Sequence, residues 1–136
     1  MRQLPYYWSE PAFDAASAAR IADVEYDTFF GWQRLARAMG YEFGSQKRRF
    51  WSFRAADVYA LLIIAKLSKL GIPIGVPQIK AVFHFCFGDD GEPRAPPGPF
   101  IQLSPCQRAY VQVDAVSLFE DVIAGCNRGA EIAKSS

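Results

Sequence analysis

Basic side chains gather in one short part of this 136-residue chain. Between residues 34 and 54, six arginines and lysines accompany a single acid, Glu42, so this segment has a charge of +5 in a chain whose total is only +1. The six are Arg34, Arg37, Lys47, Arg48, Arg49 and Arg54. Guanidinium and ammonium groups bind phosphate oxygens, and their clustering is typical of a surface that binds nucleic acid. From residue 85 onward the balance is reversed, with four basic residues against seven acidic ones.

Two helices separated by a short turn are predicted just before the basic segment. Asp14 can cap a helix that ends at Ala22, and Asp23-Val24-Glu25 is the predicted turn. A second helix is expected from Tyr26 to about Met39, because apolar residues recur there at every third or fourth position and Gly40 follows. These apolar residues are Phe29, Trp32, Leu35 or Ala36, and Met39. The pattern indicates a helix-turn-helix.

A basic hairpin and a further helix are expected next. Tyr41–Phe43 and Arg49–Trp51 flank a glycine-containing stretch, Gly44–Lys47, which predicts two short strands joined by a turn. Such a hairpin beside a helix-turn-helix would be a wing. Ser52 can then cap a helix over Phe53–Leu70, whose few polar positions indicate that it is covered on more than one side.

The rest of the chain is expected to contain less regular structure. Pro77 begins a short predicted helix to about Phe85, and three Gly and four Pro in Gly88–Pro99 indicate a mobile surface loop. Two strands, Phe100–Leu103 and Tyr110–Val113, and a last helix from Asp114 to about Ala124 follow. The predicted fold is mainly α with small β. Its parts are an arm (1–13), a winged helix-turn-helix domain (14–87), the loop (88–99), a hairpin plus helix (100–127) and a frayed tail (128–136).

Three segments, in this order, resemble the winged-helix DNA-binding domain of MerR-type regulators. They are Ala18–Trp32, Arg48–Val58 and Leu67–Lys80, and they span about half of the chain. Thr28 to Trp32 would be the T-x-x-x-W signature of the recognition helix. The resemblance implies that this helix enters the major groove and reads bases, while the wing holds phosphates. The implied base-reading residues are Asp27, Thr28, Phe30 and Gly31; the implied phosphate-binding residues are Lys47, Arg48 and Arg49, and we add Arg34, Arg37 and Arg54.

This sequence differs from the family pattern in two places. Many relatives have basic side chains where this chain has Glu25 and Asp27. We therefore expect few direct contacts with bases, and we expect contacts with phosphates to supply most of the affinity. After the domain, the usual long dimerisation helix and effector region are not expected. The chain would then be a small, excisionase-like or atypical member. We expect a homodimer, because a second copy of the chain would cover the apolar helix Phe53–Leu70 and the unpaired edges of the two later strands.

The predicted function is a sequence-specific transcriptional regulator that binds duplex DNA in the cytoplasm, with RNA polymerase or another regulator as a further candidate partner. Two alternatives stay open. A helix-turn-helix scaffold with acidic and aromatic residues in its recognition turn could instead bind a protein. A small winged helix could also be an architectural or excisionase-like factor that bends DNA.

Other classes of function find little support. No phosphate-binding glycine loop, nucleophile elbow or acid/base pair is evident, so no catalytic residue, cofactor or metal is predicted. Cys86, Cys106 and Cys126 form no C-x-x-C pair and are expected to be reduced thiols, with thiol or metal sensing as the lesser alternative. No apolar run approaches the roughly 20 residues that span a bilayer, and the N-terminus does not resemble a signal peptide.

Overall fold

The computed structural model describes residues 4–48, 50–106 and 109–135, with side chains for all of these except 103–106, 109–111 and 129–135. The fold is mainly helical with two small antiparallel sheets, as the sequence predicts. The helices are α1 (Ala15–Ala22), α2 (Tyr26–Ala38), α3 (Ala55–Lys69), α4 (Val76–Phe87) and α5 (Ala115–Ser135), with a 3₁₀ turn, η1 (Tyr6–Trp8), before them. The strands are β1 (Phe13–Asp14), β2 (Ser45–Lys47), β3 (Phe50–Phe53), β4 (Phe100–Cys106) and β5 (Ala109–Asp114).

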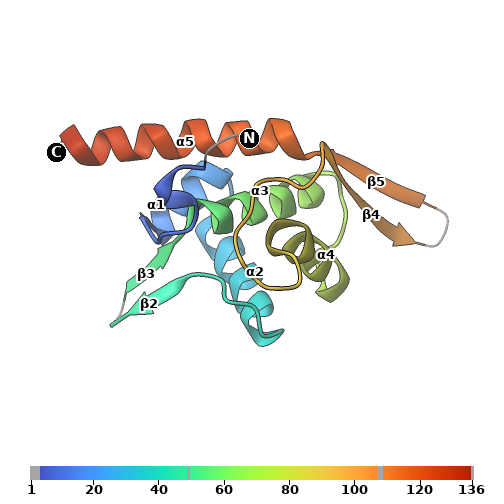
Figure 1. The fold of residues 1–136 in the computed structure, drawn as a ribbon. Helices are drawn as coiled ribbons and strands as arrows, with labels where there is room; N and C mark the ends of the chain where they lie inside the picture. The colour runs from blue at the N-terminus through green and yellow to red at the C-terminus, as the bar shows by residue number, and fades with distance from the viewer. Residues whose placement is uncertain (1–3, 49, 107–108, 136) are drawn as a thin grey trace.

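Helix α3 is the centre of the molecule. Every residue from Ala55 to Ala65 is buried, and so is Leu67, because α1, α4, α5 and η1 all pack against this helix. Figure 1 shows α5 lying along α1 and α3, with the β4–β5 hairpin at one end of the molecule. From the sequence we expected a partner subunit to cover the apolar helix α3. The structure shows that contacts within the chain cover it, so its apolar sequence does not require a partner.

The N-terminal arm is part of the core. Trp8 is fully buried, with its ring 5.6 Å from that of Tyr59 and 5.0 Å from that of Phe119. Its indole Nε1 donates a hydrogen bond to the Arg94 carbonyl at 3.2 Å, and the Tyr7 hydroxyl donates to Asn127 Oδ1. The arm thus joins the start of the chain to α5 and to the loop that follows α4.

The Pro/Gly loop is held at one point. The Arg94 guanidinium donates to the carbonyls of His84 and Phe85 at 3.1–3.2 Å, which satisfies the C-terminal end of α4. The sequence indicates a mobile loop over Gly88–Pro99, but this arginine and the hydrogen bond from Trp8 fix its middle to the folded body.

Helix α5 is longer than the sequence indicates. It begins as predicted, with Asp114 Oδ1 accepting a hydrogen bond from the Ser117 amide at 2.9 Å, but it continues to Ser135. The expected helix end near Ala124, the frayed tail and the absence of a long C-terminal helix are therefore wrong. Gly125 does not end the helix; a Cβ at this position would lie 3.0 Å from Ile21 Cγ2, so the glycine allows α5 to approach α1 closely. Figure 1 shows the last turns of α5 extending past α1.

The start of α1 depends on one side chain. Asp14 Oδ1 accepts a hydrogen bond from the Ser17 amide at 2.7 Å, and this bond lowers the pKa of the Asp14 carboxyl. We expect Asp14→Ala to lower the free energy of unfolding by about 1 kcal/mol in urea titrations, while Asp14→Asn keeps most of the cap. Because the folded pKa is depressed, the charge stabilises the fold above the usual carboxyl range, and this contribution is lost as the pH falls through the folded pKa. Equal stability of Asp14→Ala and the parent would contradict the cap.

Candidate nucleic-acid interface

The turn between α1 and α2 sets the direction of α2. Asp23 has a left-handed backbone with φ of 55°, and the Val24 amide donates to the Ala19 carbonyl at 3.0 Å. Lys69 Nζ at the end of α3 lies 3.0 Å from the Asp23 carboxylate. On the inner side, Ala18, Ala19 and Ala22 are buried, and such small side chains allow the helices to pack closely. The predicted turn over residues 23–25 is confirmed.

One face of α2 is exposed to solvent. Phe29, Gln33 and Ala36 point inward and are buried, whereas the predicted site residues of this helix other than Phe30 are exposed: Asp27, Thr28, Gly31, Arg34 and Arg37. At about 3.6 residues per turn, Asp27, Gly31 and Arg34 form one stripe along the helix. A Cβ added at Gly31 would meet nothing within 4 Å, so a partner can approach the backbone closely at the middle of this stripe.

Phe30 occupies a different position from the other predicted base readers. It is half-buried, and its ring makes edge contacts with Phe29 at 5.2 Å and Tyr26 at 4.6 Å between centroids. The ring is thus held between two aromatic neighbours of its own helix, and only part of it is accessible to a partner.

The basic hairpin forms, but with its turn displaced from the predicted position. Strands β2 and β3 pair through Ser45–Ser52, Gln46–Trp51 and Lys47–Phe50, so the chain reverses between Lys47 and Phe50 and not over Gly44–Lys47. Gly44 has a different role: its φ is 86°, and a Cβ there would lie 2.6 Å from the Phe53 ring. Phe43 is buried in the core and not in a strand. The glycine therefore marks a close contact between the hairpin base and the core.

The turn presents positive charge to solvent. Lys47 and Arg48 are both exposed, and Arg48 has a left-handed backbone with φ of 60°. Arg49 lies outside the described residues. The guanidinium of Arg37 lies 4.7 Å from the centre of the Trp51 ring, which couples the exposed face of α2 to the hairpin through a cation–π contact. The structure thus brings the cations of α2 and of the hairpin onto neighbouring elements.

Arg54 does not belong to the exposed cations of α2 and the hairpin, because it is paired with Asp57. Its guanidinium donates to Asp57 through Nε at 3.1 Å and Nη2 at 2.8 Å, and its own amide donates to the same carboxylate at 3.0 Å. Arg54, and not Ser52, is the N-cap residue of α3, and the helix begins at Ala55 and not at Phe53. Asp57 is buried, and this burial raises the pKa of its carboxyl against the opposing effect of Arg54. The arginine is a partner of a buried acid, and we remove it from the candidate DNA-binding residues.

Two exposed aromatic residues were not among the predicted site residues. Phe50 is 77% exposed at the end of the hairpin, and Tyr26 is 51% exposed at the start of α2. The exposure of Phe50 follows from the alternation of side chains along β3. Trp51 and Phe53 share the inner face, so Phe50 and Ser52 must face outward. That signal depends on the strand register, which the sequence alone did not supply.

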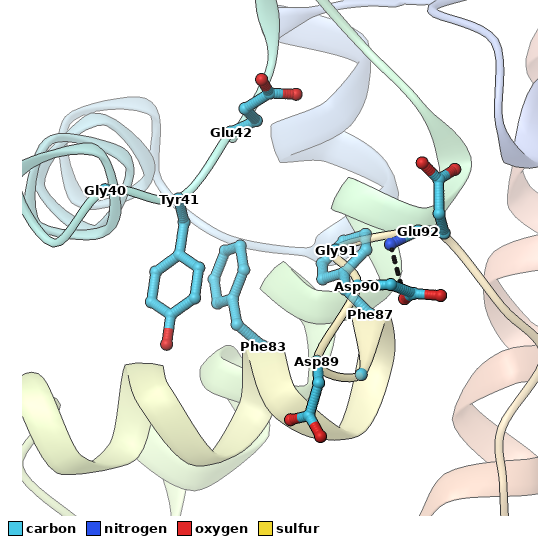
Figure 2. Close-up of a pocket in the computed structure, with 10 residues that line it drawn as sticks. Gly40, Tyr41, Glu42, Phe83, Phe87, Asp89, Asp90, Gly91 and Glu92 are labelled. Atoms are coloured by element: carbon cyan, nitrogen blue, oxygen red, sulfur yellow. Dashed lines mark hydrogen bonds between the residues drawn. The ribbon is translucent and has the colours of Figure 1, made fainter.

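An acidic hollow limits the basic surface on one side. A cavity of about 420 Å³ lies between the end of α2, the segment before β2 and the C-terminal end of α4, and four acidic residues are among those that line it (Figure 2). They belong to Glu42, Asp89, Asp90 and Glu92. Phe83 stacks on Tyr41 at 4.7 Å beside them. Glu42, which is the one acid in the basic segment, therefore belongs to the acidic side, and a polyanion would be repelled from this hollow.

No group of three or more His, Cys, Asp or Glu in the described part of the chain is placed to hold a metal ion. Cys86 and Cys126 are buried free thiols, and burial raises the pKa of both; the Cys106 side chain lies outside the described part. None of the helices that the structure describes is long and apolar enough to cross a membrane. Comparisons with protein-family models, curated proteins and solved structures gave no match to this chain.

Proposed function

We propose that this chain is a winged helix-turn-helix protein that binds duplex DNA, with α2 in the major groove and the β2–β3 hairpin as a phosphate-binding wing. The observation that carries the proposal is the position of the cations. Arg34 and Arg37 on the exposed face of α2, and Lys47 and Arg48 on the hairpin, lie on two elements that the Arg37–Trp51 contact joins. A helix and a neighbouring basic ribbon together match the groove-and-backbone arrangement by which such proteins bind DNA.

The chemistry of α2 favours a small set of base contacts. Asp27 can accept a hydrogen bond from the amino group of cytosine, and Thr28 can touch a thymine methyl group. Gly31 leaves room for the backbone of α2 to lie deep in the groove. An acid on a surface that binds phosphates costs affinity unless it faces a base amino group, so we assign Asp27 to base reading and Lys47, Arg48, Arg34 and Arg37 to phosphates.

We further propose a transcriptional regulator of MerR-like type that acts as a homodimer. The resemblance of the sequence supports the type. The length of α5 supports the dimer, because the last turns of this helix extend past α1 and could pair with the same helix of a second copy. Sedimentation across a range of concentrations tests this point, and a mass that stays at one chain would contradict it.

Selection from a library of random duplexes is the experiment that tests DNA binding. We expect a defined site to be enriched, with a cytosine that loses its preference in Asp27→Ala but not in Asp121→Ala, an exposed acid on α5. Failure to enrich any site, together with no gel shift at about 50 mM salt, where phosphate contacts are strong, would contradict the proposal. That result would favour the alternative of a protein-binding module, in which exposed Tyr26 and half-buried Phe30 form the contact.

A further inference from the structure

Phe50 is an exposed aromatic residue at the turned end of the β2–β3 hairpin. The residue is 77% exposed, the largest exposed fraction among the large apolar residues of the described part of the chain. Single exposed apolar residues are common on protein surfaces, so the exposure of Phe50 is informative only through its position beside the exposed cations Lys47 and Arg48. It begins β3 opposite Lys47, and in an antiparallel ribbon such opposite residues lie on the same face. Trp51 and Phe53 on the other face already fill the space toward the core.

The hairpin that carries Phe50 is firmly attached at its base. Phe53 is fully buried, and Gly44 allows the two strands to close on its ring. Trp51 lies beneath the guanidinium of Arg37. Figure 1 shows the β2–β3 hairpin projecting from the helical part of the molecule. The exposed phenyl ring is therefore carried on an anchored ribbon.

We propose that Phe50 is a wedge that enters the minor groove, partly unstacks one base step and kinks the bound duplex. The inference rests on the proposed DNA binding and adds to it a residue and a deformation of the DNA. Lys47 and Arg48 on the same end of the hairpin bring the ring against a polyanion, which fits DNA better than an apolar protein surface. The minor groove is only about 6 Å wide, so one ring at a tight turn suits it.

Apolar wedges of this kind kink DNA by about 20–90°, at steps that unstack easily. Pyrimidine–purine steps such as TA and CA/TG are the most flexible. We therefore expect selected sites to contain one of these steps where the hairpin meets the duplex. A binding platform for single strands is the less suitable reading, because such platforms stack successive bases on several aromatic rings.

The test measures the bend and the binding separately. The probe is the best duplex from the selection, labelled with a donor and an acceptor at its two ends and with 2-aminopurine at the flexible step. We expect the parent chain to shorten the end-to-end distance and to raise the 2-aminopurine signal. Phe50→Ala should bind about tenfold more weakly and lose both signals, while Phe50→Leu, which keeps an apolar wedge, should retain much of the bend.

Matched controls separate the possible failures. Phe100→Ala removes another exposed phenylalanine, at the base of β4, and should change neither the bend nor the affinity. Since Phe50 lies outside the core, Phe50→Ala should melt at the same temperature as the parent. If the parent binds duplex without bending it, or if Phe50→Ala bends it equally, the wedge is wrong and DNA binding stands. If the chain does not bind duplex at all, both the wedge and the proposed DNA binding are wrong. If the parent binds single strands more strongly than duplex and Phe50→Ala loses that binding, only the wedge is wrong.

Discussion

Replacement of Lys47 by glutamine together with Arg48 by asparagine should weaken binding to duplex DNA by about 60-fold at 0.1 M salt. Each phosphate contact contributes about 0.9 to the slope of log K against log salt, so removal of two contacts should flatten this slope by about 1.8. Asparagine is chosen at Arg48 because the backbone there is left-handed, with φ of 60°, and asparagine tolerates that conformation. The measurement is a salt titration by fluorescence anisotropy on the selected duplex and on a scrambled one.

The loss should be nearly equal for the two duplexes, because phosphate contacts carry no sequence information. The control is Lys66→Gln with Arg128→Gln, which removes the same charge from a hollow between α1, α3 and α5. This variant should keep most of the affinity and almost the whole slope. If the hairpin variant and the control behave alike, the hairpin does not hold phosphates, and net charge alone accounts for the binding.

Asp57→Ala should lower the free energy of unfolding by about 3–5 kcal/mol, the usual cost of removing one partner of a buried ion pair. Asp57 is buried, and its carboxylate accepts two hydrogen bonds from the Arg54 guanidinium and one from the Arg54 amide. Without it, the first turn of α3 loses an amide partner, and the guanidinium, whose side chain is only 17% exposed, loses its counter-charge. Urea unfolding followed by circular dichroism gives the value.

Two further variants test the cause of that loss. Arg54→Met with Asp57→Leu removes both charges and should recover part of the stability, because apolar replacements of a buried pair avoid an unpaired ion. Asp121→Ala removes an exposed carboxylate from α5 and should change the stability by less than about 0.5 kcal/mol. If Asp57→Ala unfolds like the parent, the pair contributes nothing to the fold, and Arg54 would return to the candidate DNA-binding residues.

Local signals in the sequence were sufficient to predict that the five helices form and to identify the caps of two of them. Asp14 and Asp114 cap α1 and α5 as predicted, and the turn over residues 23–25 contains two acidic residues between two apolar patterns. The apolar content of α3 indicates burial on several sides, and the structure has it packed by four elements. Capping and periodicity depend on residues a few positions apart, so they can be recognised without knowledge of the rest of the fold.

Contacts between distant residues decided the rest. Gly44 resembles a turn residue in the sequence, but its contact with Phe53 places it at the hairpin base and moves the turn past Lys47. Gly125 follows the predicted helix end at Ala124, but it lies inside α5, where its lack of a side chain allows close contact with Ile21. The sequence by itself determined which helices form and where positive charge is concentrated. Only the tertiary structure decided that Arg54 is paired internally and that Phe50 is exposed, because both depend on which side chains meet after the chain has folded.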